Sequence, residues 1–475
     1  KLTLGLRLDT PIFLNELERN PEVEALTFQG GQKIDVSQYP KTQPLFSPRL
    51  GFNWDVFNNR TLQVRGGTGI FSGTPPYVWL SNQAGNNGLL FGLLSKGRPF
   101  DGVAIYQPTA ADIQHSKMDL AVTDRNFKYP QLWKTDIAAD FMFGDGWILT
   151  GELLYNKDIH AIYHTNIGLN EPTGYVMEGG KEGRPFFATG VNSHGRPTGY
   201  FITDKTENVV MMKNTSKGYS IYTTFQLQKN FMHGPLKGLY VNGSFTFGKS
   251  KSVTDGSSSV ASSAWKYRPA INPNAEEIGF SAASFDNRLL LQVAYTANWS
   301  KNAATNFGIV YQRYRPFRFS YTYNGDVNGD GQSMNDLIFI PAKMSDINIV
   351  PAAGDTRSKE QIWQQIDNFI KQDAYLSKHR GEYAERNGGV VPFANQVDVN
   401  ISHDFKVPLR NGKVNTIRFS FDISNVLNLL NKNWGVQYTT IYGYAGSPQY
   451  QFLSMTEAPQ ASNNYTPGFT MPLKD

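Results

Sequence analysis

The sequence predicts an all-β protein: a transmembrane antiparallel β-barrel with long extracellular loops and one short loop helix. About eleven segments, mostly ~9–15 residues long, alternate apolar and polar side chains, and a period of two places successive side chains on opposite faces of a strand. Tight turns and long connections join these segments alternately, as is typical of outer-membrane barrels. Aromatic residues lie near the segment ends, where an interfacial girdle is expected.

A soluble β-propeller or β-sandwich is the main alternative. Those folds favour strands of about 5–6 residues and evenly short connections, and they need no aromatic residues at strand ends. Here Trp133, Trp147, Phe231 and Trp299 lie near the ends of long segments. The length of the segments and the asymmetry of their connections favour the barrel.

Composition excludes several classes of function. The 475 residues carry a net charge of +5, and no Lys/Arg cluster or RNA-binding motif accompanies it, so no nucleic-acid partner is expected. Cysteine is absent, which excludes disulfides, thiolate catalysis and Cys-ligated zinc. No apolar run approaches the ~18 residues of a membrane helix. No hydrolase motif such as G-x-S-x-G or H-E-x-x-H is present, so an enzyme is not expected.

The expected strands follow one another with a constant rhythm. In chain order they are 1–9, 49–56, 61–71, 131–143, 147–162, 219–231, 239–248, 285–299, 306–323, 396–405 and 416–425. Their clearest apolar rows are Leu2, Leu4, Leu6 and Leu8; Leu50, Phe52, Trp54 and Val56; Leu62, Val64 and Ile70; Trp133, Ile137, Ala139, Phe141 and Phe143; Leu289, Leu291, Val293, Tyr295 and Ala297; Val397, Val399, Ile401 and Phe405; and Ile417, Phe419, Phe421 and Ile423. The Asn-Asn and Gly-Asp-Gly turns between strands tolerate the positive φ of tight hairpins.

These strands divide the chain into a wall and its insertions. We expect residues 1–428 to form the C-terminal portion of a barrel, with extracellular insertions at about 10–48, 72–130, 163–218, 249–284 and 324–393. Residues 429–475 are expected to be an extracellular loop region before a missing final strand. With tight turns in the periplasm, the first and the eleventh strand both run outward, whereas a single-chain barrel has an even strand number. The chain is therefore expected to be a piece of a larger barrel.

One face of the strands carries charge. The row Arg65, Asp140, Glu152, Asp398, Arg418 and Asp422 is expected to face the lumen. It provides either a polar path for a ligand or simply a solvated or plug-facing wall, and the second interpretation is favoured.

Ligand contacts are sought in the second long connection. Tyr77, Trp79, Asn82 and Gln83 combine aromatic stacking with amide hydrogen bonding, which sugar and peptide ligands require. Packing of this connection against its neighbours is the favoured alternative.

The sharpest motif is a candidate calcium loop. Asp326, Asn328, Asp330, Gln332 and Asp336 supply oxygens at positions 1, 3, 5, 7 and 11, with glycine at position 6 for the sharp turn. The acidic residue usual at position 12 is missing, and Asn335 precedes Asp336. A Ca²⁺ site in an extracellular loop and a Gly/Asp-rich turn that caps backbone N–H groups are about equally favoured. No other cofactor is expected.

A single helix is expected at Ser358 to Tyr375. Ser358 and Gln361 fit a capping box, and Ile362, Ile366 and Ile370 lie on one apolar face. It is either an external lid or a helix packed on neighbouring loops, with packing favoured.

Six stretches resemble TonB-dependent receptors, most closely the Oar-like group with a carboxypeptidase-regulatory-like domain. They are TLGLRLDTPIF, SPRLGFNWDV, QVRGGTGIFSGTPPYVWLSNQ, FSYTYNGDVNGDGQSMNDLIFIP, VPFANQVDVNISHDF and FDISNVLNLLN, spread in order over residues 3–431. The resemblance implies a 22-stranded barrel whose lumen is closed by an N-terminal plug.

The resemblance also implies a function and partners. It implies a receptor in the Gram-negative outer membrane, surrounded by outer-membrane lipid, that binds a ligand through extracellular loops and imports it with energy from the TonB complex. A surface lipoprotein or other outer-membrane subunits are further candidate partners. The alternative is a surface adhesion or assembly protein whose barrel anchors partner-binding loops.

Overall fold

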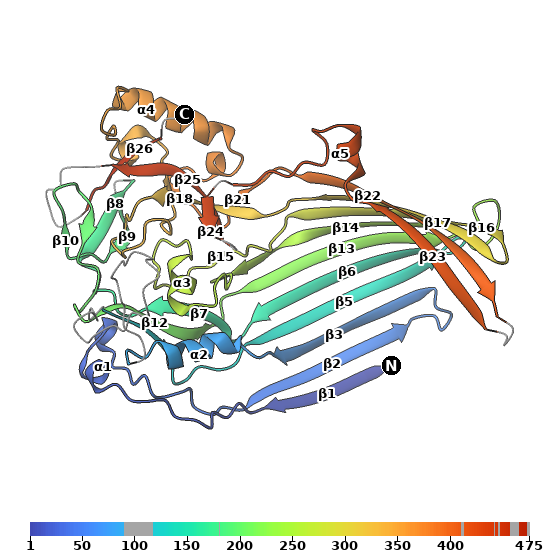
Figure 1. The fold of residues 1–475 in the computed structure, drawn as a ribbon, viewed down its shortest axis with the longest axis horizontal. Coiled ribbons are helices and arrows are strands. Elements are labelled where there is room, and N and C mark those ends of the chain that lie inside the picture. The colour runs from blue at the N-terminus through green and yellow to red at the C-terminus, as the bar shows by residue number, and fades with distance from the viewer. Residues whose placement is uncertain are drawn as a thin grey trace, which may run out of the picture.

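The computed structural model describes residues 1–89, 117–179, 181–409, 413–440, 442–444, 447–456 and 465–472. Its main feature is a wall of eleven antiparallel strands, each paired with the next wall strand along the chain (Figure 1). The wall strands are β1 (Leu2–Asp9), β2 (Leu45–Asp55), β3 (Leu62–Ser72), β5 (Gln131–Phe143), β6 (Trp147–Asp158), β13 (Tyr219–Asn230), β14 (Leu239–Ser252), β16 (Asn287–Ser300), β17 (Ala303–Tyr314), β22 (Ala394–Pro408) and β23 (Val414–Ile423). The predicted strands of the wall are confirmed.

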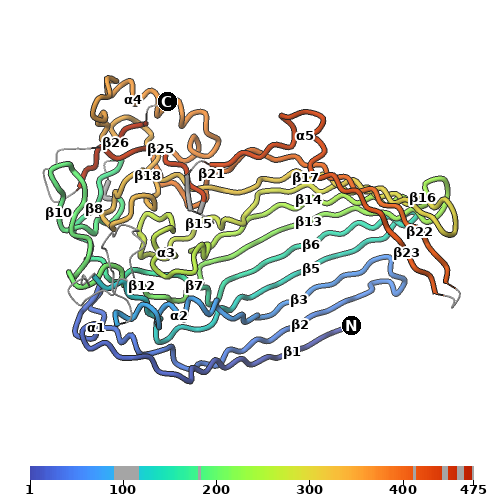
Figure 2. Tube along the Cα trace, in the orientation of Figure 1, coloured from blue at the N-terminus to red at the C-terminus, as the bar shows by residue number. Residues whose placement is uncertain are grey.

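The two ends of the wall differ as predicted. The short connections 56–61, 144–146, 231–238, 301–302 and 409–413 join strands at one end. The described parts of the connections 10–44, 73–130, 159–218, 253–286 and 315–393 gather at the other end (Figure 2).

The two faces of the wall also differ. Cross-strand neighbours share a face, so Ile137 of β5, Leu153 of β6 and Phe247 of β14 lie in one row across the wall. These three side chains are 39–48% exposed although they are large and apolar. The opposite face carries amides, hydroxyls and charges. An apolar outer face and a polar inner face are what a membrane-spanning wall requires.

Glycines let the first strands approach closely. A Cβ on Gly66 would lie 2.6 Å from the backbone oxygen of Asp136 on β5. A Cβ on Gly69 would lie 2.8 Å from the backbone oxygen of Pro48 on β2. Strand glycines mark such close backbone approaches.

Two expected strands are shorter than predicted. The expected strand 306–323 divides into β17, which stays in the wall, and β18 (Arg318–Asn324), which joins an external sheet. Pro316 lies between them and has no N–H to donate to the wall. The expected strand 147–162 ends at Asp158, and β7 (Ala161–Asn166) belongs to another external sheet.

The external connections form their own sheets. β4 (Met118–Thr123), β12 (Thr206–Thr215) and β7 form one; β21 (Gly389–Val390), β18, β25 (Ser447–Thr456), β24 (Tyr442–Tyr444) and β26 (Gly468–Thr470) form another. Two short hairpins are β8 (Gly174–Glu178) with β9 (Lys181–Phe186) and β10 (Gly190–Val191) with β11 (Pro197–Thr198). β19 (Phe339–Ile340) pairs antiparallel with the distant β20 (Glu382–Tyr383), and β15 (Gly279–Phe280) pairs with the end of β14. Strand β25, from the region after the wall, runs parallel to β18.

Helices occur outside the wall. They are α1 (Pro21–Ala25), α2 (Tyr77–Gly85), α3 (Ala261–Lys266), α4 (Lys359–Gln372) and α5 (Val426–Leu430), with 3-10 turns at Gln29–Gly31, Met344–Asp346 and Leu376–Lys378. The predicted helix is confirmed as α4, including its capping box between Ser358 and Gln361. The four others, of five to nine residues, were not predicted, because helices this short repeat an apolar pattern at most about twice. In the described part of the chain, no helix is long and apolar enough to span a membrane.

Among the described residues, four hydrophobic clusters hold the external connections together, and the largest of them joins the connections 159–218 and 315–393 to the segment after the wall. The buried faces of α4, β18 and β25 meet there, and Ile362, Ile366 and Ile370 of α4 are fully buried in it. Tyr323 and Phe469 stack in the same cluster with ring centroids 4.5 Å apart. The external connections are therefore a folded domain, and α4 packs onto it.

Candidate functional site

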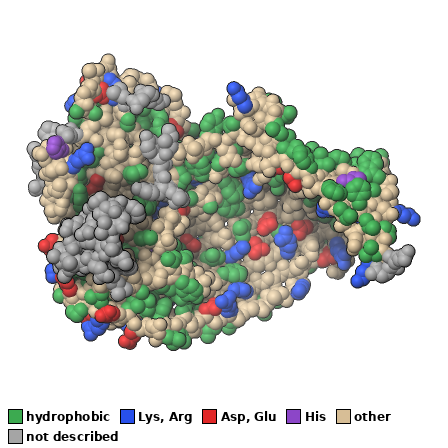
Figure 3. Space-filling model, in the orientation of Figure 1, with side chains coloured by type: hydrophobic (Ala, Val, Ile, Leu, Met, Phe, Trp, Pro, Cys, Tyr) green, Lys and Arg blue, Asp and Glu red, His purple; other side chains and the backbone are tan. Residues whose placement is uncertain are grey.

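The predicted charged row lies on the inner face of the wall, as two groups. On β3, β5 and β6, Arg65 Nε lies 3.0 Å from Asp140 Oδ2, and its Nη2 lies 3.9 Å from Glu152 Oε2. Thr150 donates to the other carboxylate oxygen of Asp140 at 2.7 Å. In Figure 3 acidic and basic side chains gather over the middle of the wall.

The second group lies on β22 and β23. Arg418 donates to both oxygens of Asp404 at 2.5 and 2.7 Å. Asn400 donates to Asp422 at 2.5 Å, and the backbone N–H of Asn425 donates to Asp398 at 2.8 Å. Each of these charges therefore has a partner on the wall or, for Asp398, in the turn that follows β23.

Neutral polar pairs cover the inner face between the two charged groups. Thr224 and Thr246 are hydrogen bonded at 2.9 Å across β13 and β14. Gln226 donates to Asn242 at 3.0 Å. Arg288 of β16 pairs with Thr246 and bonds Gln312, so it adds a charge between the two groups. The inner face is therefore a hydrogen-bonded polar surface that carries charges.

The candidate ligand residues of the second connection lie on helix α2. Gln83 is 1% exposed; its amide donates to the backbone oxygens of Val36 and Gln38, and its Oε1 accepts from Thr123 N–H. Such a side chain holds three segments together and is inaccessible to a ligand.

The other three residues on α2 differ among themselves. Trp79 Nε1 donates to the backbone oxygen of Ser258 at 2.9 Å, and Asn82 bonds the backbone of 259 and 261. Tyr77 is 68% exposed. The geometry thus matches the packing interpretation at Trp79, Asn82 and Gln83, and it leaves Tyr77 as the member with a free surface.

The candidate calcium loop is a compact turn inside the external domain. Asp326 Oδ1 accepts from the N–H groups of Gly329 and Asp330 at 2.8 and 3.1 Å. Asn328 Oδ1 accepts from Asp330 N–H at 2.9 Å, and Asp330 Oδ1 accepts from Gln332 N–H at 2.8 Å. Asn328 and Asp330 are fully buried, whereas Asp326 is partly exposed at the rim.

Asp336 has a different role from the one expected. One of its oxygens lies 3.0 Å from Arg184 Nη1, and the other accepts from Val327 N–H at 2.7 Å. Arg184 is fully buried and also pairs with Glu178 at 3.0 Å. Asp336 therefore ties the loop to the β8–β9 hairpin.

A set of hydroxyls completes this buried ionic network. Tyr323 and Tyr383 donate to the two oxygens of Glu178 at 2.6 and 2.8 Å. Arg184 lies over both rings, 5.3 and 5.2 Å from their centroids. Burial opposes the charge of Arg184, but Glu178 and Asp336 outweigh it and raise its pKa well above the ordinary value.

Burial also raises the pKa values of two acids of the loop. It raises the pKa of Asp330 to about 7, with the charge of Asp336 as a second cause. It raises the pKa of Asp336 to about 6, an effect that Arg184 limits. Among the described residues, no three His, Asp or Glu side chains are gathered closely enough to hold a metal ion by themselves.

Sequence reasoning missed two residues of this region. Asn335, 2% exposed, donates through Nδ2 to Asp330 at 2.7 Å, and its Oδ1 has no hydrogen-bond partner. Arg184 lies 152 positions before Asp336. The motif places Asn335 at position 10 but gives it no role, and no local pattern indicates Arg184.

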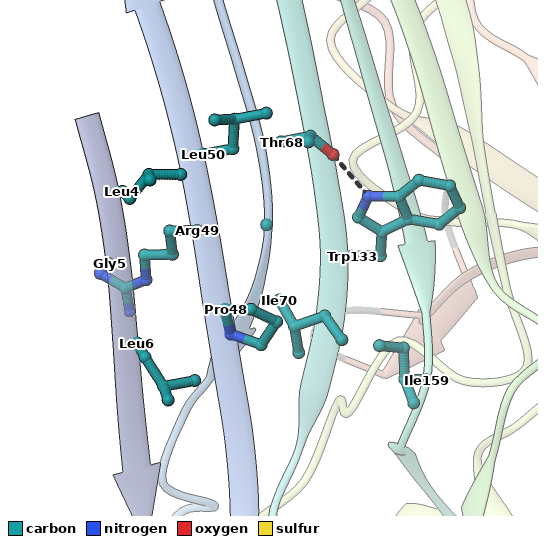
Figure 4. Close-up of a pocket in the computed structure, with 11 residues that line it drawn as sticks. Leu4, Gly5, Leu6, Pro48, Arg49, Leu50, Thr68, Ile70, Trp133 and Ile159 are labelled. Atoms are coloured by element: carbon teal, nitrogen blue, oxygen red, sulfur yellow. Dashed lines mark hydrogen bonds between the residues drawn. The ribbon is translucent and has the colours of Figure 1, made fainter. Parts of the chain in front are cut away.

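Two hollows lie in different parts of the structure. One, of about 740 Å³, lies on the apolar face of β1 to β3 among Leu4, Leu50, Ile70 and Trp133, where the indole donates to Thr68 (Figure 4). Because this face is the membrane-facing one, the hollow has no role in ligand passage. The other, of about 500 Å³, lies in the external domain and is lined by Lys33, Asp35, Asp124 and Arg125.

Comparison with known proteins gives the family. The model of the outer membrane beta barrel domain family matches residues 2–441. No curated protein sequence matches the chain.

Several solved structures resemble the chain weakly. The outer membrane transporter YddB from Escherichia coli has a TM-score of 0.41 at 12% identity, covering 82% of this chain and 37% of that one. A mutant of the ferric enterobactin receptor PfeA from Pseudomonas aeruginosa has 0.37 at 10% identity, covering 90% and 39%. The FrpB iron transporter from Neisseria meningitidis has 0.28 at 9% identity, covering 79% and 40%.

The chain thus spans about two fifths of the length of these structures. Likeness at this level carries no argument about activity. The family match, the meander of long strands and the apolar outer face agree with one another. The chain belongs to the outer membrane β-barrel domain family and resides in the outer membrane of a Gram-negative cell.

Proposed function

We propose that this chain forms the wall and the external domain of a TonB-coupled receptor that imports a ligand across the outer membrane. The observation that carries the proposal is the folded external domain. Hydrophobic clusters join the long connections at one end of the wall to one another, whereas the connections at the other end are short turns. An open pore needs no such domain, but a receptor needs a rigid surface to select its ligand.

The external hollow is the proposed first contact for the ligand. Lys33 and Arg125 are exposed at it and provide donors, while Asp35 and Asp124 provide acceptors. Exposed Tyr77 provides an aromatic surface elsewhere in the external domain. The polar inner face would then carry the ligand past the membrane.

The receptor requires a closed barrel. In the described chain β1 pairs only with β2, and β23 pairs only with β22. Unpaired backbone N–H and C=O groups are costly in hydrocarbon, so spanning sheets close on themselves. We therefore include in the proposal further strands that pair with β1 and β23, and a plug that covers the polar inner face.

An uptake assay tests the proposal. Cells that make the whole protein are given labelled sugars, peptides and iron chelates, with and without TonB. Uptake of at least one compound that disappears without TonB supports the receptor, and uptake that is equal in both strains contradicts it. Arg125→Ala should weaken surface binding of that compound, while Arg60→Ala, in a turn at the opposite end of the wall, should leave it unchanged.

A surface adhesion or assembly protein is the second candidate. The external domain has hydrophobic clusters of its own, as an anchored partner-binding module would need. On this alternative, loss of the protein abolishes attachment of cells to a surface or partner, and loss of TonB has no effect.

A further inference from the structure

We propose that the loop from Asp326 to Asn335 binds one divalent cation of the Ca²⁺ class inside the external domain. The proposed ligands are side-chain oxygens of Asp326, Asn328, Asp330 and Asn335, with the backbone carbonyl of Gln332 at the seventh position. This site is independent of the ligand and of energy coupling.

The backbone of the loop is already shaped around these oxygens. Gly329 and Gly331 have φ of 69° and 82°, the left-handed region that favours glycine. A Cβ on Gly329 would lie 2.7 Å from that of Ala188, so the adjacent segment also excludes a side chain there. Asp326 Oδ2 and Asp330 Oδ1 each accept one backbone N–H, from Gly331 and Gln332, and so keep a second lone pair for a cation.

Asn335 supplies the independent observation. It is 2% exposed, and its amide lies against Asp330, to which Nδ2 donates at 2.7 Å. Its Oδ1 is buried without a hydrogen-bond partner. A buried oxygen without a donor is unfavourable, and a hard cation is the partner that an oxygen among carboxylates accepts most readily.

The charges around the loop do not balance. Glu178, Asp330 and Asp336 are buried, and among the described residues Arg184 is the cation paired with this network. Asp326 adds a further negative charge at the rim. Buried charges are normally paired or coordinate metals.

The chemistry of the oxygens selects the ion. Ca²⁺ accepts six to eight oxygen ligands from carboxylates, amides, carbonyls and water, in flexible geometry. The set therefore does not need three converging carboxylates. The partly exposed position of Asp326 gives the ion access from outside.

Bound cation would stabilise more than the loop. Asn328 O accepts from Phe187 N–H at 2.9 Å, and Asp336 joins the loop to Arg184. Tyr465 stacks on Phe186 with centroids 4.6 Å apart, so the segment near the C-terminus meets the same hairpin. We infer that the ion locks the loop, the β8–β9 hairpin and this segment together.

The test uses the whole protein purified in detergent and stripped with EGTA. Calorimetric titration with Ca²⁺ should show one site per chain, and Ca²⁺ should raise the midpoint of thermal unfolding of the external domain. Terbium should bind at the same place and emit on tyrosine excitation, because the ring of Tyr200 lies against Gly331. A flat titration with terbium emission at its baseline overturns the proposal.

Variants separate ligation from packing. Asp330→Asn and Asn335→Leu should weaken Ca²⁺ binding at least about tenfold, and Asn335→Asp should tighten it, because affinity follows the charge of the ligand set. Asp204→Asn, at an exposed external position, is the matched control and should bind as the unmodified chain does. Equal affinity in all four variants, or weaker binding in Asn335→Asp, contradicts the assignment.

Discussion

Replacing Arg184 by methionine is expected to loosen the external domain while leaving the wall intact. The guanidinium is fully buried, with Glu178 and Asp336 each 3.0 Å away. Methionine fills a similar length but carries no charge and no donor. The two carboxylates would then remain buried without their cation.

The magnitude follows from these distances. At an effective dielectric of about 20, two charges at 3.0 Å attract by about 5–6 kcal/mol, so two contacts give about 11 kcal/mol before desolvation. Desolvation removes several kcal/mol for each ion, and loss of one partner of a buried pair destabilises by about 3–5 kcal/mol. The hydroxyls of Tyr323 and Tyr383 still donate to Glu178 in the variant, so we expect a loss of stability at the lower end of this range, about 3 kcal/mol.

Hydrogen exchange in the detergent-solubilised protein measures the effect by region. Amides of β8, β9 and β18 should exchange roughly 100-fold faster in Arg184→Met, since every ~1.4 kcal/mol is a factor of ten. Amides of β5 and β6 should be unchanged, because the wall does not contact Arg184.

A matched control uses an exposed pair. Arg19, which bonds Glu24 at the surface, should tolerate Arg19→Met without any change in exchange. Acceleration below about fivefold in Arg184→Met would refute the reasoning, because it would mean that the two acids had found other partners or had become neutral. Restored protection in the triple variant with Glu178→Gln and Asp336→Asn would support it.

Three further predictions concern other parts of the molecule. Gly66→Ala should lower the temperature at which the barrel unfolds on a heated gel, because its Cβ would meet a backbone oxygen at 2.6 Å. Gly51→Ala, whose Cβ would have its nearest atom at 3.8 Å, should leave this temperature unchanged. Equal shifts of the two variants would contradict the prediction. Gln83→Leu should destabilise the external domain by about 1–3 kcal/mol in hydrogen exchange, since it leaves two carbonyls and one N–H without partners, and the control Tyr77→Ala should not. Burial lowers the pKa of His164 from 6.5 to about 4, so the neutral ring favours the folded state above pH 6.5. About 3 kcal/mol of folding stability is therefore lost as the pH falls from 6.5 toward 4. His164→Gln should reduce this acid sensitivity, and an unchanged pH profile of proteolysis would refute the prediction.

Local pattern was sufficient for the wall. The predicted strand 131–143 has the bounds of β5, because thirteen residues with a period of two between turn signals fit hardly any structure other than a strand. The break between β17 and β18 could have been predicted, since Pro316 cannot donate a backbone hydrogen bond to a sheet. The apolar residues on both sides of Pro316 made the segment look like one continuous strand.

Local pattern was insufficient for the residues between the strands. Gln83 looks like a ligand-binding amide in the sequence, and the structure gives it backbone partners 40 to 47 positions away. Nothing in the spacing of the chain indicates such partners. The same holds for Asn335, whose unpartnered oxygen is visible only once burial is known.

The sequence by itself determined the number and order of the wall strands, which face is apolar, and the place of helix α4. Each depends on side chains a few positions apart, and backbone geometry converts their period directly into a face. The tertiary structure alone decided which hydrophobic clusters join the long connections, that Arg184 holds Glu178 to Asp336, and that α2 packs among its neighbours. These are contacts between distant segments, and no local period encodes which of many apolar and polar groups will meet when the connections fold.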